Sequence, residues 1–205
     1  MASDAFKLFK ALMDYVEQLV EIHGSVQTGR GRRHRQEALH RAGVVMTVAA
    51  WESYVEFVLL EGFKTIAPAA GDPAWSKASF NLSKVRAKQQ AGDFHTPNAE
   101  NVRKLFMQTI GYDPWQDWYY IAPRRNWQSS EMRDRLDNWL RIRHAVAHGG
   151  ALPTNIPWIK SPQGKSRLTL DLLRECRRFF DRLVHCTDGG FSCYLQSEFG
   201  IAAPW

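Results

Sequence analysis

The sequence has few cysteines and no long apolar run. These two features argue against a disulfide-rich protein, a zinc knuckle and a membrane-spanning protein. Its three cysteines, Cys176, Cys186 and Cys193, form no C-x-x-C pair, so neither a disulfide framework nor a zinc knuckle is expected. The longest apolar run, 43–51, is far shorter than the roughly 20 residues that span a bilayer. The N-terminus also lacks the apolar core of a signal peptide. We therefore expect a soluble protein of the reducing cytoplasm, without a membrane partner.

The sequence also lacks the alternation of apolar and polar residues that marks half-buried strands, and it contains no repeat or low-complexity tract. Apolar residues recur instead every three or four positions, which is typical of amphipathic helices. We predict one all-α domain over 1–205, a bundle of four or five principal helices. The first helix is flanked by Ser3 and Gly24. The others are expected at 33–66, 75–90 (weakly), 97–110, 131–148 and 169–187.

A tryptophan-rich insert, 112–128, interrupts this helical pattern. It carries three Trp and three Tyr among prolines and arginines, and we interpret it as an ordered loop or a short helix packed on the body. Ser129 and Ser130 are the predicted caps of the helix that follows. Thr96-Pro97 is the predicted start of the helix over 97–110. The tail, 189–205, is expected to add at most a short helix.

The charge of the chain favours an anionic partner, with nucleic acid ahead of a membrane surface. The formal net charge is +6, from 27 Lys and Arg against 21 Asp and Glu. The 18 arginines outnumber the 9 lysines, and arginine binds phosphate through two parallel donors. A codon bias would explain this ratio equally well. Only the positions of the arginines can distinguish it from phosphate binding.

The most informative segment is Asn138-Trp-Leu-Arg-Ile-Arg-His-Ala-Val-Ala-His148-Gly-Gly. It places two arginines and two histidines at the C-terminal end of a predicted helix. Arg141, His144 and His148 fall on one face, whereas Arg143 lies about 140° around from His148 at about 100° per residue. The macrodipole at a helix C-terminus favours the charged form of His148. Arg-x4-His also occurs at Arg35…His40, so spacing alone decides nothing.

The context of the motif is more specific. Arg143-His144-Ala-Val-Ala-His148-Gly149 follows, later in the chain, a helical segment Ala50-Trp51-Glu52-Ser-Tyr54-Val55-Glu56. Together they resemble the HEPN superfamily, in particular its prokaryotic branch with a Trp-Glu-x-Tyr-x-Glu helix and an Arg-polar-x3-His-Gly helix. The resemblance covers about 35–185. One departure is His144, which stands where Asn is commonest.

The resemblance implies a dimeric, HEPN-like helical bundle in which the Arg-x4-His motifs of two protomers meet in one cleft. Many HEPN domains are metal-independent ribonucleases, often toxins or effectors of antiviral defence, and others only bind nucleotides or partners. Carried over by position, Arg143 and His148 take the catalytic slots and His144 takes the polar slot. A cognate antitoxin or another regulatory protein is then an expected partner, beside RNA.

The chemistry of these side chains is consistent with that assignment. RNA cleavage without a metal requires a deprotonated 2′-hydroxyl, a stabilised phosphate and a protonated 5′-oxygen. Histidine titrates near neutrality and serves as base or acid, and arginine stabilises the charge that develops on the phosphate. One motif supplies too few groups for all three tasks, whereas a two-fold dimer presents the same groups twice. The expected products are a 2′,3′-cyclic phosphate and a 5′-hydroxyl.

Supporting roles are expected for Glu52, Glu56 and Arg141. Glu52 is expected to orient His148 or to pair with Arg141 or Arg143. The alternative for Glu52 and Glu56, two solvated carboxylates on an amphipathic helix, is equally consistent with the sequence. Trp51, beside Glu52, is better explained as an anchor of the core.

Two basic segments are candidate RNA contacts. Arg33 and Arg35 lie in a basic run over 30–35, and Arg124 and Arg125 lie in the tryptophan-rich insert. Solvated positions for the first pair, and core or dimer packing of the aromatic insert, are the alternatives.

No cofactor and no metal ion are expected. His144 and His148 could provide two zinc ligands, but no third ligand is evident and two arginines stand beside them. A metal-independent endoribonuclease is therefore the leading prediction. The alternatives are a non-catalytic HEPN module that binds RNA, a nucleotide or a protein, and a plain helical scaffold.

Overall fold

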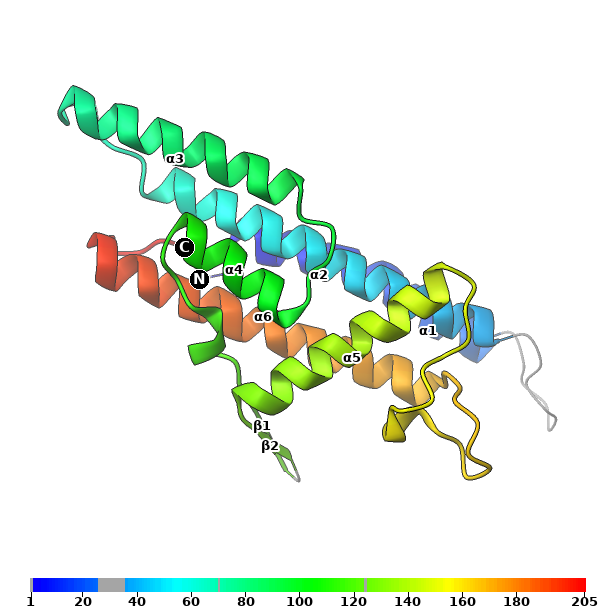
Figure 1. Cartoon of the computed structure of the whole chain (residues 1–205). Coiled ribbons are helices and arrows are strands. Elements are labelled where there is room, and N and C mark those ends of the chain that lie inside the picture. Colours follow the sequence, from blue (N-terminus) through cyan, green and yellow to red (C-terminus); the bar gives the residue numbers. More distant parts are fainter. Residues whose placement is uncertain (1, 26–35, 70, 124) are drawn as a thin grey trace.

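The computed structural model describes residues 2–25, 36–69, 71–123 and 125–205 (Figure 1). These residues form six α-helices, and the predicted all-α class is confirmed. The helices are α1 (Asp4–Ser25), α2 (Glu37–Thr65), α3 (Ala74–Gly92), α4 (Ala99–Thr109), α5 (Ser129–Ala147) and α6 (Leu170–Phe199). Two 3-10 turns, η1 (Pro114–Gln116) and η2 (Pro157–Ile159), and a hairpin of β1 (Tyr120–Ala122) and β2 (Arg125–Trp127) lie between them.

The helices α1, α2 and α6 form the long body of the bundle, and α5 crosses it (Figure 1). The start of α1 is tied to the end of α2, because the backbone N–H groups of Asp4 and Ala5 donate to the Glu61 carboxylate at 2.9 and 3.0 Å. It is tied to α6 as well, through Ser3 N–H and the buried Asp188 carboxylate, 3.2 Å apart. One hydrophobic cluster contains residues from all six helices.

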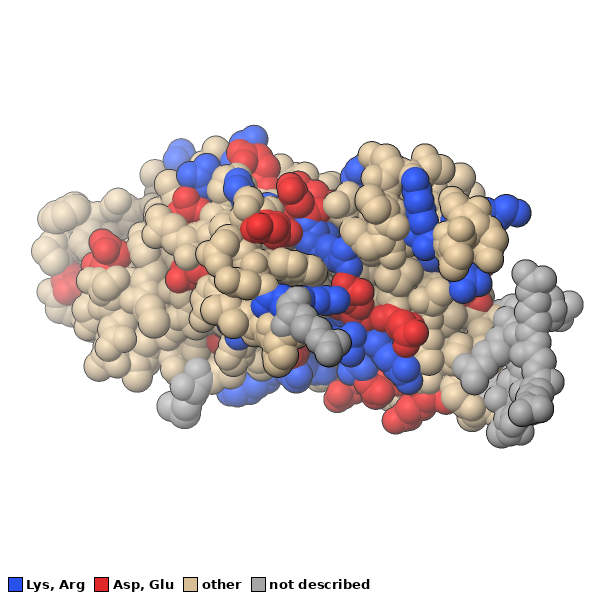
Figure 2. Space-filling model, turned by 90° about the horizontal axis from the view of Figure 1, so that it is seen from below, with Lys and Arg blue, Asp and Glu red and all other residues tan. Residues whose placement is uncertain are grey.

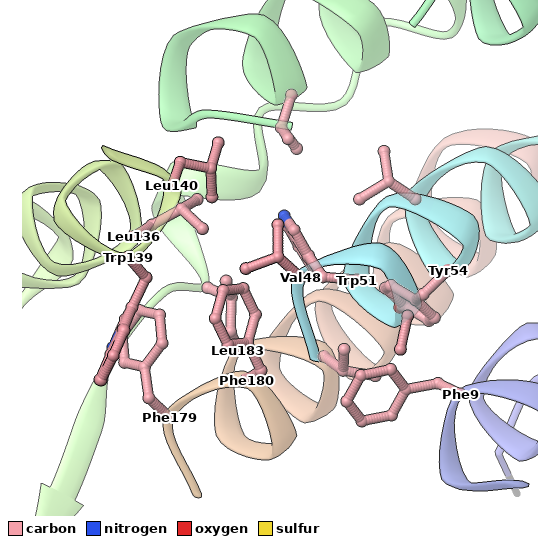
Figure 3. Close-up of a cluster of buried hydrophobic side chains, with 14 of the residues drawn as sticks. Phe9, Val48, Trp51, Tyr54, Leu136, Trp139, Leu140, Phe179, Phe180 and Leu183 are labelled. Atoms are coloured by element: carbon pink, nitrogen blue, oxygen red, sulfur yellow. The ribbon is translucent and has the colours of Figure 1, made fainter. Parts of the chain in front are cut away.

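Trp51 lies at the centre of this cluster, as expected of a core anchor (Figure 3). Its ring stacks on Tyr54, with 5.7 Å between centroids, and meets Trp118 edge to face at 6.3 Å. Its indole N–H donates to the carbonyl of Pro97 at 3.0 Å, so the buried polar atom is satisfied. Since Trp51 points inward, the next residue, Glu52, lies at the edge of the buried face.

The helix α2 is long and apolar enough to cross a membrane by length and composition alone. Of its apolar 18-residue window, 56% is buried inside the bundle, which is the pattern of a central core helix. Packing in the core therefore explains why this window is apolar. The absence of a membrane partner stays a prediction.

The last helix is longer than predicted. A helix over 169–187 and a separate tail over 189–205 were expected; Gly189-Gly190 lies between them. Instead α6 continues to Phe199 and ends at Gly200, whose φ is +67°. Packing explains why residue 190 is a glycine, since a Cβ there would collide with the carboxylate of Asp117. That carboxylate accepts a hydrogen bond from Tyr112 at 2.7 Å.

Other local predictions also need correction. The tryptophan-rich insert contains a hairpin in which Tyr120 pairs with Trp127; its three-residue strands are too short to show an alternating pattern. The cap of α5 is Gln128, which forms a capping box with Glu131, and Ser129 is already helical. Asn98, not Thr96, caps α4. The predicted start of the second helix at 33 lies outside the described residues, and α2 begins at Glu37.

Candidate active site

The C-terminal end of α5 presents the histidine motif. The backbone N–H of His148 still donates to the carbonyl of His144 at 3.1 Å. The N–H of Gly150 donates to the carbonyl of Ala145 at 2.8 Å. Between them Gly149 has a φ of +66°, a left-handed conformation that favours glycine. The helix predicted over 131–148 therefore ends where expected, at the C-cap His148.

Arg143 and Glu52 form the central contact of the site. Arg143 Nη2 donates to Glu52 Oε2 at 3.3 Å, which links α5 to the middle of α2. Both side chains are partly buried, 28% exposed for Arg143 and 19% for Glu52. Of the partners considered for Glu52, Arg143 is the one that the structure places beside it. Among the described residues, no hydrogen bond joins Glu52 to His148.

His144 and His148 lie on the outer side of α5, one turn apart. Their ring centroids are 4.4 Å apart and their planes are tilted by 49°. His144 and His148 are both exposed, whereas Arg143, on another side of the helix, is partly buried. The two imidazoles therefore lie close together at the helix end, and Arg143 is directed toward Glu52 on α2.

Arg141 is held away from Glu52. Its Nη2 donates to the side-chain carbonyl of Asn155 at 2.8 Å, and its Nη1 donates to that of Asn138 at 3.3 Å. Asn155 belongs to the loop that follows α5. The contacts of Arg141 thus hold that loop against the motif helix, and its supporting role stays a prediction.

Burial raises the pKa of Glu52, and the positive charges of Arg143 and His95 oppose that shift. The pKa of Glu56 is also raised, first by burial and then by the negative charge of Glu52, while His95 again opposes the shift. Glu56 is half-buried, one turn along α2 from Glu52. The structure therefore gives Glu56 an electrostatic link to Glu52.

His95 is the neighbour that the sequence did not reveal. It lies in the connection between α3 and α4, which two hydrogen bonds hold against the bundle. Trp51 Nε1 donates to Pro97 O, and Ala99 N–H donates to Asp137 Oδ1 at 2.9 Å. These two bonds hold the α3–α4 connection against both α2 and α5, near Glu52. A single histidine in a loop carries no sequence signal that would connect it with a motif elsewhere.

Comparison with known protein families matches residues 8–192 to the family described as RiboL-PSP-HEPN. The chain belongs to the RiboL-PSP-HEPN family. The match includes α1, which the resemblance seen in the sequence left out. No curated protein and no solved structure gives a match.

The predicted RNA contacts of this RiboL-PSP-HEPN chain are only partly visible. Arg33, Arg35 and Arg124 lie outside the described residues. Arg125 is described, and its guanidinium is engaged within the molecule. It pairs with Glu175 at 3.2 Å and lies over the ring of Trp127, 4.9 Å from the centroid.

Arg125 belongs to a structural cluster centred on Arg135, which lies on the same Glu175 carboxylate. The Arg135 guanidinium is 3.4 Å from the ring centroid of Trp158 and also faces Trp127 and Trp139. Cation–π contacts of this kind join the hairpin and η2 to α5. The aromatic insert thus contributes to packing, and an RNA contact by Arg125 stays a prediction.

The possible metal ligands of this RiboL-PSP-HEPN site are limited. Among the residues that the structure describes, no group of three or more His, Cys, Asp or Glu side chains is placed to hold a metal ion. His144 and His148 offer two nitrogen ligands at most. The absence of a metal ion stays a prediction.

Proposed function

We propose that this RiboL-PSP-HEPN chain is a metal-independent endoribonuclease whose active site contains Arg143, His148 and His144. The observation that carries the proposal is the position of Arg143. An ion pair with Glu52 holds it at the helix end where two histidines lie one turn apart. Membership of the HEPN family supports a nuclease or an RNA-related module. An arginine and two imidazoles at the end of one helix fit cleavage of a phosphodiester.

In the proposed reaction a neutral imidazole takes the proton of the 2′-hydroxyl. The 2′-oxygen then attacks phosphorus, and the bond from phosphorus to the 5′-oxygen breaks. A second, protonated imidazole gives its proton to that leaving oxygen. The products are a 2′,3′-cyclic phosphate and a 5′-hydroxyl. Arg143 stabilises the negative charge on the phosphate oxygens, and Glu52 fixes the orientation of the guanidinium.

The reaction is proposed to take place in a homodimer, in which a second copy contributes its own arginine and histidines. One surface suits this role: the α1–α2 apolar face, formed by Leu8, Tyr15, Met46 and Phe57, which are 36–55% exposed. Its middle is a shallow hollow lined by residues of both helices, including Tyr15 and Met46. This face shares helix α2 with Glu52 and Glu56 of the candidate site, and Phe57 directly follows Glu56 in the sequence. A two-fold contact across it would bring two such sites close together.

The test is cleavage of single-stranded RNA by the purified protein in excess EDTA. The substitution His148→Ala is expected to lower the rate by at least about a hundredfold, the usual contribution of a general acid or base, with an unchanged circular dichroism spectrum. Arg143→Ala should do the same, whereas Arg86→Ala on the exposed side of α3 should leave the rate unchanged. Activity that EDTA abolishes would contradict the metal-independent mechanism.

A non-catalytic module that binds RNA, a nucleotide or a protein is the second candidate. The observation that favours it is that Glu52 already neutralises Arg143 in this structure. RNA binding without any cleavage, insensitive to His148→Ala, would establish this alternative.

The biological setting follows from the nuclease proposal. A cytoplasmic ribonuclease would act as a toxin or an antiviral-defence effector, held in check by a cognate antitoxin or another regulatory protein. Growth arrest on expression, relieved by His148→Ala, is the expected result. Expression of wild-type protein without any effect on growth would speak against the toxin role.

A further inference from the structure

A basic groove runs along α6, away from the histidine motif. It consists of two adjoining hollows that share Arg178 and Asp181. The first is completed by Lys10, Met13, Arg174 and Arg177, and the second by Tyr120, Ile121, Arg182 and His185. We call these residues the α6 groove. Figure 2, which views the molecule from the hairpin side, shows Lys and Arg side chains in a band with carboxylates among them.

The cations of the α6 groove outnumber the acids that could neutralise them. Asp181 is the carboxylate that lines it, and it pairs with Lys10 at 2.7 Å. At the rim, Glu17 pairs with Arg177, and the highly exposed Asp171 lies 3.5 Å from Arg174. Within the part of the chain that the structure describes, Arg178 and Arg182 have no carboxylate partner. The groove therefore keeps positive charge that an anion can neutralise.

The spacing of the arginines suits a polymeric anion. Arg174, Arg178 and Arg182 follow one another every four residues on α6, so their Cα atoms advance by about 6 Å each along the helix axis. All three line the groove. A row of guanidinium groups at this spacing can contact successive phosphates of an extended strand.

The hairpin adds an aromatic and apolar end to the row. Arg182 Nε donates to Tyr119 O at 3.1 Å, and the guanidinium lies 4.6 Å from the centre of the Tyr119 ring. Tyr119 remains 43% exposed and Ile121 69% exposed. Cationic grooves beside exposed aromatic rings are typical of sites for unpaired nucleic acid, because every base has a face that can stack.

From these observations we infer that the α6 groove binds the backbone of single-stranded RNA and holds long substrates on the protein. The inference rests on the proposed function for its choice of RNA, and it adds a binding track distinct from the reacting groups. An acidic protein segment would use the same charges, but it would not need the exposed aromatic ring beside Arg182.

The test compares Arg174→Gln/Arg178→Gln with the matched control Lys84→Gln/Lys88→Gln, which removes the same charge from exposed positions of α3. The probe is a labelled 2′-O-methyl oligouridylate of about 20 nucleotides, which has no 2′-hydroxyl and is not cut. Its affinity is measured by fluorescence anisotropy as a function of salt concentration. The groove variant should bind about tenfold to thirtyfold more weakly at low salt. Its slope of log affinity against log salt should fall by about 1.4, for two lost phosphate contacts.

Equal affinity and slope for the groove variant and the wild type would overturn the inference, and so would a wild type that does not bind the strand. Capture of a polyglutamate peptide in place of RNA, lost in the groove variant, would assign the groove to an acidic protein segment instead. Because the probe is not cut, failure of the nuclease proposal leaves this result unaffected. For an active enzyme, the groove variant should lose activity on long RNA and keep it on a dinucleotide.

Discussion

Glu52 is held between two opposing effects. Burial in the α2–α5 contact favours its neutral form, whereas Arg143 and His95 favour the carboxylate. The ion pair with Arg143 forms only while Glu52 is charged, so the orientation of the arginine depends on the protonation state of Glu52. A titration of Glu52 therefore reports how strongly its carboxylate interacts with Arg143.

Arg143→Gln should raise the pKa of Glu52 further. Of the two positive side chains that lower this pKa, Arg143 has the larger effect, and the substitution removes it. The measurement is a pH titration of the Glu52 side-chain carboxyl by carbon NMR. In the wild type the carboxylate should form at a lower pH than in the variant. Arg141→Gln is the matched control, since Arg141 contacts Asn138 and Asn155 instead. Equal shifts in both variants would contradict a specific pairing of Glu52 with Arg143.

At the residue scale the sequence located the motif but not its contacts. The Glu-rich turn of α2 and the Arg-His end of α5 were both recognisable as patterns. Which arginine meets Glu52 depends on the rotation of α5 against α2, and the packing of Trp51 against the connection after α3 contributes to it. His95 joins the site through that same connection. Tertiary packing of this kind leaves no mark on local sequence.

At the scale of elements, α6 shows how packing overrides a local stop signal. Two adjacent glycines in a helix interior are unfavourable by roughly 0.5–1 kcal/mol each relative to alanine. The helix nevertheless continues, because Phe191 and Leu195 are buried beyond them. Gly190 is needed where α6 meets Asp117, whereas a Cβ at Gly189 would point into open space.

Gly190→Ala should destabilise the protein by about 1–3 kcal/mol, the usual cost of overpacking, since the new methyl group would displace Asp117 from Tyr112. Gly189→Ala, one position earlier in the same helix, should stabilise it by about 0.5–1 kcal/mol through helix propensity. Urea unfolding followed by circular dichroism measures both values. Equal effects of the two substitutions would show that Asp117 does not set the requirement at Gly190.

The helices α1, α5 and α6 were predictable because each presents an apolar stripe to the bundle. The hairpin was not, since three-residue strands carry no period and its residues are held by the Arg135 cluster. The cap of α5 was misplaced for a related reason. Gln128 acts only together with Glu131, and the serines beside it are stronger caps by composition alone.

At the scale of the whole molecule, the reaction is proposed to take place in a homodimer. The described motif offers two imidazoles and one arginine already paired with Glu52. The proposed reaction uses a base, an acid and a phosphate contact at the same time, and Arg143 makes that contact in the orientation that Glu52 fixes. A second copy docked on the α1–α2 apolar face is proposed to contribute its own arginine and histidines, and it would cover side chains that are exposed here.

Phe57→Glu should therefore separate the dimer and abolish RNA cleavage together. Phe57 is 48% exposed, so the folded monomer should tolerate the change, whereas a charge buried within an apolar interface is strongly unfavourable. Leu82→Glu is the matched control, since Leu82 is 66% exposed on α3. Light scattering gives the oligomeric state, and the cleavage assay in EDTA gives the activity of the same samples. A monomeric Phe57→Glu variant that still cleaves RNA at the wild-type rate would show that one chain carries the complete site.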